Sequence, residues 1–142
     1  MPGPLALAVT REQLTDWLDA YFDAWRSNDG AEVAKLFAED ALYSYGPFRE
    51  PARGREQLVA NWVADGAPLS AESRYEILAA NDDLAIVHWN VRQKAYYFHE
   101  PTLELDGILV LRFNAAGQCV EHLEWFDRRT IDEPPGAPPV PD

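Results

Sequence analysis

The chain has 142 residues, of which 47% are apolar and 25% are charged, so it is long enough to bury the core of one domain. Acidic side chains outnumber basic ones by 24 to 12, giving a formal net charge of −12. This charge argues against nucleic acid or an anionic membrane as a partner, since both attract lysine and arginine.

The first nine residues, MPGPLALAV, are expected to form an extension ahead of the domain. They lack the basic region and the long apolar run of a secretory signal peptide. No apolar stretch of the sequence reaches the length of a membrane span. The single cysteine, Cys119, excludes a disulfide within the chain. We therefore expect a cytoplasmic protein with no membrane segment.

Two helices are predicted first, one ending at the break in residues 27–30 and a short one after it. The first begins at a T-x-x-Q capping box made by Thr10 and Gln13. Its large apolar side chains recur on one helix face: Leu14, Trp17, Leu18, Tyr21, Phe22 and Trp25. Asp29 and Glu32 form a second capping box, which opens the short helix. The short helix is expected to bury three apolar residues: Val33, Leu36 and Phe37.

A strand and a third helix are predicted next. Residues 41–45, ALYSY, alternate as a strand does and place Tyr43 and Tyr45 on one face. Residues 46–54 are rich in glycine and proline and indicate a loop. The third helix is expected from about residue 55 to residue 65.

Beyond the third helix the apolar pattern changes from helical to alternating. Four strands are expected, at 74–80, 84–98, 103–113 and 119–129, with a hairpin turn at 114–118. In the second of these, Val87, Trp89 and Val91 share one face and polar side chains alternate with them, which is typical of a half-buried strand. The order of elements predicts an α+β domain over residues 10–130. The proline-rich tail, residues 131–142, is expected to be extended or disordered.

The last strand contains EHLEWFD, which mixes carboxylates with aromatic side chains. Strand alternation places three residues on one face: His122, Glu124 and Phe126. It places five on the other: Cys119, Glu121, Leu123, Trp125 and Asp127. We expect the first face to point into the domain.

Three segments of the sequence resemble the SnoaL-like or NTF2-like superfamily: LDAYFDAWRSNDGAEVAKLFAEDALYSY, GREQLVANW and LRFNAAGQCVEHLEWFD. The resemblance implies an α+β cone, with three N-terminal helices packed on a strongly curved antiparallel or mixed sheet. It also implies a largely apolar pocket between the first helix and the concave face. The superfamily includes ketosteroid isomerase, limonene epoxide hydrolase and polyketide cyclases, so the resemblance does not specify one reaction.

Ketosteroid isomerase chemistry is disfavoured by the residues at the matching positions. The oxyanion-hole tyrosine of that enzyme falls on Tyr21, which is retained. Its catalytic aspartate falls on Tyr45 and its second aspartate near Leu109, and neither side chain can perform those roles.

The similarity to limonene epoxide hydrolase is partial. Its strand-one tyrosine falls on Tyr43 and its water-activating aspartate on Glu124, but its Arg–x–Asp pair falls on Trp89 and Val91. The aspartate of SnoaL-type cyclases falls on Asp127, which is therefore an alternative acid.

The predicted site is a polar group of side chains within an apolar pocket. Glu124 is expected to transfer a proton with the help of His122, while Tyr21, Tyr43 and Tyr45 contact a substrate oxygen. The apolar wall is expected to contain Trp17, Trp62, Trp89, Val91, Leu109, Leu111 and Phe126. One inward histidine and one carboxylate fall short of a catalytic zinc site, so we expect neither a metal nor another cofactor.

Three functions are compatible with this sequence. The first is a cofactor-independent enzyme that hydrolyses, dehydrates, isomerises or cyclises a small apolar organic molecule by acid–base chemistry. The second is a non-catalytic module that binds such a molecule, and the third is a protein-interaction domain whose cone is filled by aromatic side chains. Family members pair through the convex face of the sheet, where Leu123 and Trp125 are expected, so a homodimer is expected.

Overall fold

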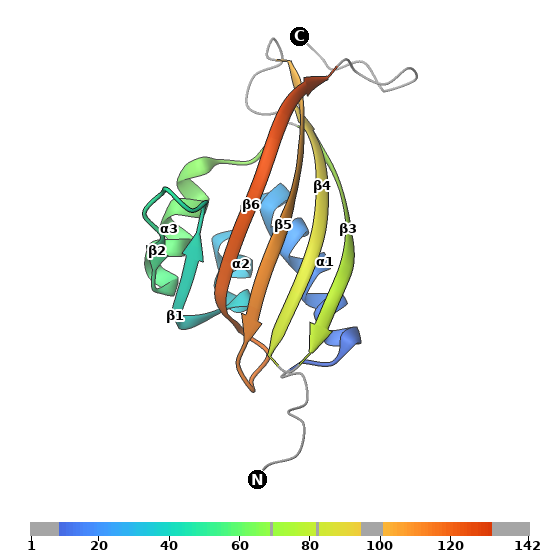
Figure 1. Cartoon of the computed structure of the whole chain (residues 1–142). Coiled ribbons are helices and arrows are strands. Elements are labelled where there is room, and N and C mark those ends of the chain that lie inside the picture. The colour runs from blue at the N-terminus through green and yellow to red at the C-terminus, as the bar shows by residue number, and fades with distance from the viewer. Residues whose placement is uncertain (1–8, 69, 82, 95–100, 132–142) are drawn as a thin grey trace.

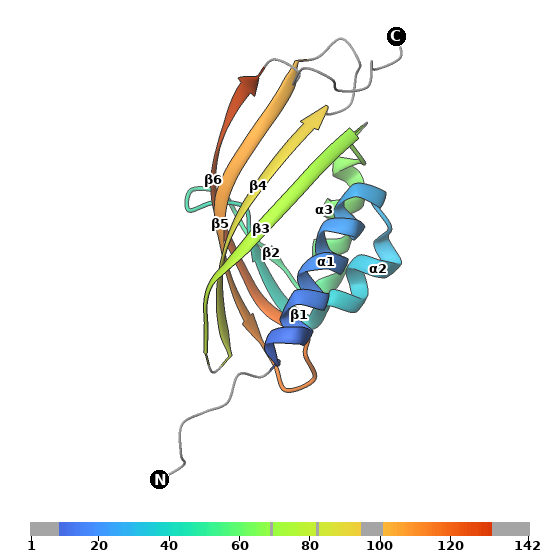
Figure 2. The same cartoon turned by 90° about the vertical axis from the view of Figure 1, so that its right-hand side faces the viewer.

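Three helices cover one face of a single six-stranded sheet in the computed structural model, which describes residues 9–68, 70–81, 83–94 and 101–131 (Figure 1, Figure 2). The helices are α1 (Arg11–Ser27), α2 (Gly30–Leu36) and α3 (Arg55–Asp65). The strands are β1 (Phe37–Ser44), β2 (Ala52–Arg53), β3 (Ser70–Asn81), β4 (Leu84–Lys94), β5 (Thr102–Phe113) and β6 (Cys119–Ile131). The α+β class is therefore confirmed.

The sheet has the order β2-β1-β6-β5-β4-β3 and is mixed. Strand β1 pairs in parallel with β6, and every other pair is antiparallel. The parallel pair brings Tyr43 of β1 opposite His122 of β6, so that residues from the first and last parts of the chain become neighbours. The strong curvature that the resemblance implies for this sheet stays a prediction.

The first helix begins as its capping box predicts. The Thr10 hydroxyl accepts from the Gln13 backbone N–H at 3.0 Å, and the Gln13 side-chain oxygen accepts from the Thr10 N–H at 2.8 Å. The helix ends where Asn28 adopts the left-handed conformation at φ 56°. Its buried stripe includes Trp17 and Tyr21, which face the sheet.

Two predictions about the middle of the chain are wrong in detail. Phe37 does not continue the second helix, because its backbone is extended (φ −120°, ψ 147°) and it starts β1, although its side chain is fully buried as expected. The expected loop at 46–54 contains the two-residue strand β2, which pairs with Leu42 and Tyr43. A strand this short offers too few residues for an alternating pattern to be seen.

The sheet has an inner face, covered by the helices, and an outer face. Alternation along β4 to β6 sends Trp89, Leu109 and His122 to the inner face, where they are buried with the aromatic stripe of α1. Cys119 was expected on the outer face but is fully buried in the core. The pairing of β5 with β6 shifts between Arg112 and Phe113, so a bulge reverses the alternation before Glu121.

Several predicted features lie outside the described residues: most of the extension 1–9, residues 95–98 of the long strand, and the tail beyond residue 131. Among the helices that the structure describes, none has both the length and the apolar composition to cross a membrane.

Candidate active site

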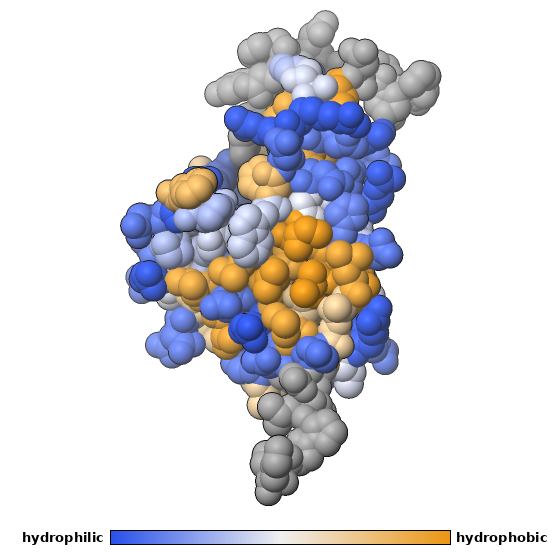
Figure 3. Space-filling model, viewed as in Figure 1, coloured by the Kyte–Doolittle hydropathy of each residue, from blue (hydrophilic) through white to orange (hydrophobic). Residues whose placement is uncertain are grey.

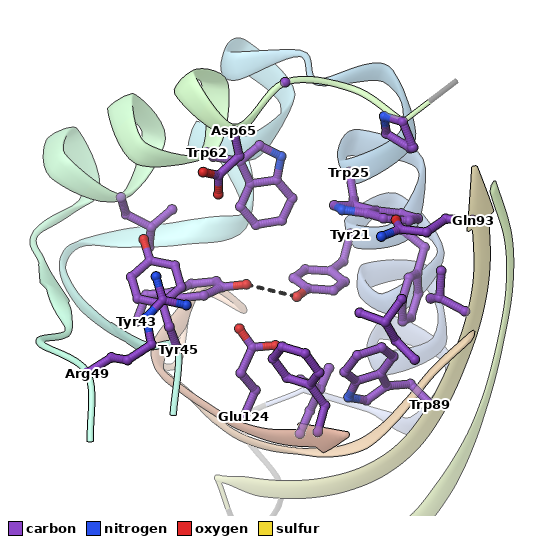
Figure 4. A pocket seen from close by; sticks show the side chains of 18 residues that line it. Tyr21, Trp25, Tyr43, Tyr45, Arg49, Trp62, Asp65, Trp89, Gln93 and Glu124 are labelled. Atoms are coloured by element: carbon purple, nitrogen blue, oxygen red, sulfur yellow. Dashed lines mark hydrogen bonds between the residues drawn. The ribbon is translucent and has the colours of Figure 1, made fainter. Parts of the chain in front are cut away.

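A cavity of about 280 Å³ lies between helices α1 and α3 and the inner face of the sheet (Figure 4). Its described lining includes a polar group made of Tyr21, Tyr43, Tyr45, Arg49, Asp65, Gln93 and Glu124. Its apolar lining includes Phe22, Trp25, Leu58, Trp62, Trp89, Val91, Leu105, Leu109 and Phe126. Eight of the 18 described lining residues are aromatic, and several polar groups converge on the same space, which is the usual composition of a small-molecule site.

Glu124 extends from the inner face of β6 into this cavity, opposite Leu109 of β5. Figure 4 shows its carboxylate pointing toward the pair formed by Tyr21 and Tyr43. Burial raises the pKa of Glu124 from its ordinary 4.5 to about 7, and the charge of Arg49 opposes that rise. No described residue donates a hydrogen bond to this carboxylate. Glu124 can therefore exchange a proton near neutral pH and is open to a ligand.

Tyr21 of α1 and Tyr43 of β1 form a buried pair of hydroxyls. Their oxygens lie 3.1 Å apart, and the Tyr21 oxygen also lies 3.0 Å from Nε2 of His122. Burial and the nearby charge of Glu124 raise the pKa of both tyrosines well above 10. Both therefore remain protonated, as hydrogen-bond donors rather than phenolates.

His122 lies on the inner face of β6, as alternation predicted, but it is not beside the Glu124 carboxylate. It is fully buried behind the tyrosines, does not line the cavity, and is hydrogen-bonded to Tyr21 rather than to Glu124. Its ring stacks on that of Tyr43, with centroids 3.8 Å apart and planes 8° apart. Burial lowers the pKa of His122 to about 3, so it cannot act as a proton donor to substrate near neutral pH.

Tyr45 lies just beyond β1, nearer to solvent than the other two tyrosines. Its hydroxyl accepts a hydrogen bond from the Asn61 side chain at 3.1 Å, and the Arg49 guanidinium lies 5.1 Å from its ring centroid. Burial raises the pKa of Tyr45, while the Asn61 hydrogen bond lowers it. The guanidinium of Arg49, from the loop after β1, thus lies at the edge of the cavity (Figure 4).

Three other predicted residues lie outside the lining. Trp17 precedes Tyr21 by one turn of α1, and its indole N–H donates to the Leu36 carbonyl at 2.9 Å. Leu111 is fully buried in the core, two residues from Leu109, and does not line this cavity. Asp127 is exposed at the surface and does not line the cavity, so its carboxylate does not face a molecule bound there.

Several lining residues were not predicted. Gln93 continues the alternation of Trp89 and Val91, so that pattern, extended by two residues, would have found it. Asp65 follows Trp62 by three residues on α3, which is one helix turn. Arg49 belongs to a loop, where no periodicity exists to indicate direction. Among the described residues no three side chains of His, Cys, Asp or Glu gather as a metal site would require.

Comparison with known proteins identifies the family of this chain and shows solved structures that share its fold. A family model described as "SnoaL-like domain" matches residues 18–122, well over half of the chain. No match is found among curated proteins.

Solved structures with the same fold include two related to epoxide chemistry. One is an epoxide hydrolase from M. tuberculosis of the type called LEH-like: TM-score 0.63, 12% identity, covering 82% of this chain and 84% of that one. Another is SalBIII, an epoxide hydrolase/cyclase-like enzyme in pyran ring formation in salinomycin: TM-score 0.68, 13% identity, covering 85% and 98%. A third is an NTF-2 like protein of unknown function from Burkholderia xenovorans: TM-score 0.63, 21% identity, covering 88% and 89%. Identities this low establish the fold alone.

Proposed function

Since this chain belongs to the SnoaL-like family, we propose that it is an acid–base enzyme, independent of a cofactor, that acts on a small and mostly apolar organic molecule. The observation that carries the proposal is the carboxyl group of Glu124, which has a pKa of about 7 and faces a cavity lined by aromatic side chains. A group that titrates near the working pH is suited to take and return a proton.

The cavity divides into a reacting end and a binding end. At the reacting end, Glu124 faces Tyr21 and Tyr43, whose protonated hydroxyls can donate to an oxygen on which charge develops. At the binding end, Trp62 and Trp89 offer flat apolar surfaces to a hydrocarbon body. The substrate class that fits both ends is a compact, ring-bearing molecule with one oxygen function.

Opening of an epoxide is the reaction we favour within this class. The Glu124 carboxylate would remove a proton from water or from a hydroxyl of the substrate, whose oxygen then bonds to an epoxide carbon. The carbon–oxygen bond of the epoxide breaks as this bond forms, and the resulting alkoxide takes the proton back from Glu124. Attack by water gives a diol, and attack by a substrate hydroxyl gives a new ring. The structurally similar enzymes are described as an epoxide hydrolase and an epoxide hydrolase/cyclase-like enzyme. Because Trp89 and Val91 replace the Arg–x–Asp pair of limonene epoxide hydrolase here, the hydroxyls of Tyr21 and Tyr43 would have to polarise the epoxide oxygen.

The substitution Glu124→Gln tests this proposal. Cyclohexene oxide would serve as the probe for hydrolysis, and a hydroxy-epoxide as the probe for ring closure. We expect Glu124→Gln to lower turnover at least 100-fold, since general acid–base catalysis contributes about 10²–10⁴-fold, while the affinity for the probe changes little. Glu121→Gln is the control, because Glu121 lies on the same strand but pairs with Arg112 on the outer face. Turnover unchanged in Glu124→Gln, or binding of both probes without turnover, would favour a non-catalytic binding module.

A further inference from the structure

His122 is held in one orientation by its neighbours. Its ring stacks on Tyr43, and its Nε2 atom lies 3.0 Å from the Tyr21 hydroxyl. Its other ring nitrogen, Nδ1, is buried without a hydrogen-bond partner among the described residues. The backbone of His122 itself favours a proton on the ring and so raises its pKa slightly, but Nδ1 has no partner within hydrogen-bond geometry.

The ring of His122 is neutral, so a single proton resides on either Nε2 or Nδ1. If Nδ1 carried the proton, this buried N–H would have no acceptor within hydrogen-bond geometry among the described residues. If Nε2 carries it, the N–H is used in the bond to Tyr21 and only a lone pair remains unmatched. Buried N–H groups without an acceptor are rarer than buried acceptors without a donor, which favours the proton on Nε2.

The position of this proton decides what the tyrosine pair can offer to the cavity. Tyr21 and Tyr43 have one hydroxyl proton each, and the bond between them uses one of the two. When Nε2 of His122 donates to Tyr21, the second hydroxyl proton remains free. When Nε2 instead accepts from Tyr21, both hydroxyl protons are used and the pair can only accept.

We infer that His122 is a positioning residue whose Nε2–H donates to Tyr21, so that the Tyr21–Tyr43 pair presents one free O–H to the cavity. The catalytic part of this inference rests on the proposed function. The inference also narrows the class of ligand given above, since it requires an oxygen that accepts a hydrogen bond. The pair would bind a molecule with an acceptor oxygen, such as an epoxide, ether or ketone. Because that O–H belongs to a chain of hydrogen bonds, donation from His122 also makes it a stronger donor.

The tautomer of His122 can be read directly by NMR of the full-length protein labelled with ¹⁵N in histidine. At pH 8.5 we expect two-bond correlations in the ¹⁵N–¹H spectrum to show a protonated Nε2 and an unprotonated Nδ1. His88 provides an internal reference, because its Nε2 lies 2.8 Å from a carboxylate oxygen of Asp106 and must donate to it. The signals of His122 are assigned by their loss in His122→Gln. If that variant does not fold, they are assigned by nuclear Overhauser contacts between the His122 ring and the ring of Tyr43, on which it stacks. A proton found on Nδ1 of His122 would overturn the inference.

The free O–H has a separate test that does not depend on turnover. Cyclohexanone and methylenecyclohexane have nearly the same shape, but only the ketone accepts a hydrogen bond. We expect the ratio of their affinities to shift toward the hydrocarbon by about two- to tenfold in the double variant Tyr21→Phe/Tyr43→Phe, as the loss of one hydrogen bond predicts. The measurement is made at pH 8.5, where Glu124 is ionised and does not donate. An unchanged ratio would show that the pair has no free donor and would contradict the inference, whether or not the protein is an enzyme.

Discussion

Trp89 and Phe126 meet across Gly107, although their strands β4 and β6 are separated by β5. The three residues form one row of the sheet, and the ring centroids of the two aromatics lie 5.8 Å apart. A Cβ atom on Gly107 would lie 2.3 Å from the Trp125 carbonyl oxygen and 2.6 Å from the Phe126 Cβ. Glycine is therefore required here by close approach of the β6 backbone.

We predict that Gly107→Ala destabilises the protein by about 1–3 kcal/mol, the usual cost of overpacking. The backbone atoms that it would contact cannot move without disturbing the row that walls the cavity. Urea denaturation of the wild type and variant gives the difference. Gly30→Ala is the matched control, because its Cβ would meet only the side chains of Val59 and Val63, at 3.4 and 3.1 Å. An equal cost at both positions would contradict this explanation.

A second prediction concerns the protonation of Glu124. Burial raises its pKa to about 7, so its carboxylate should form only as the pH rises through that value. A ¹³C NMR titration of the glutamate carboxyl groups should show one signal with a midpoint near pH 7, and this signal should be absent in Glu124→Gln. If Glu124 acts as a base, turnover should follow the same curve and decrease below pH 7. A midpoint near 4.5 would mean that the carboxyl is solvated, and the proposed mechanism would lose its main support.

A third prediction concerns the outer face of the sheet. Apolar side chains gather there across β4, β5 and β6 (Figure 3). The strand register places Ile86, Val110 and Leu123 in one row of this face and Ile108 and Trp125 in another, and Trp125 is 45% exposed. We propose that a second copy of the chain covers this area, since a monomer rarely leaves so continuous an apolar face exposed.

Light scattering on the purified protein should then give twice the chain mass of 16.0 kDa. Trp125→Glu should lower the mass to that of one chain, because it places a charge in the interface. Phe48→Glu makes the same kind of change at a fully exposed loop residue and should leave the mass unaltered. A wild-type mass of 16.0 kDa would contradict the proposed dimer.

Much of the fold could be predicted because its signals are local. The Thr10–Gln13 capping box marks the start of α1, and strict alternation identifies Val87, Trp89 and Val91 as inner residues of β4. Alternation fails at Cys119, because the bulge before Glu121 adds a residue that a fixed period of two does not count.

The site was harder to predict, because alternation gives the face of a side chain but not its depth. His122 and Glu124 share the inner face of β6, yet only Glu124 reaches the cavity. The difference arises from β1, which pairs in parallel with β6 and places the ring of Tyr43 over His122. That contact joins residues far apart in the sequence, so no local pattern contains it. Arg49 was missed for a similar reason, since a loop has no period.

The last prediction is that Glu124 lowers stability at the pH where it would function. Its pKa is raised from 4.5 in the unfolded chain to about 7 in the folded one, so folding favours the protonated form. Below pH 4.5 both states are protonated and the folded state bears no cost. Between pH 4.5 and 7 the unfolded chain ionises first, and stability decreases as the pH rises. Above pH 7 the loss is complete, at about 3 kcal/mol by the pKa difference, or about 2 kcal/mol once partial exposure is allowed for.

Glu124→Gln should remove this pH dependence, because glutamine does not ionise. We expect the variant to exceed the wild type in free energy of unfolding by about 2 kcal/mol at pH 8 and to match it near pH 4. Glu121→Gln should show no such gain, since Glu121 lies on the outer face in an ion pair with Arg112. Urea denaturation of the three proteins at pH 4, 6 and 8 measures both effects. A variant less stable than the wild type at pH 8 would mean that the Glu124 carboxylate is stabilised by its surroundings, which contradicts a cavity that raises its pKa. The gain at pH 8, combined with loss of turnover, would identify Glu124 as a residue retained for function at the expense of stability.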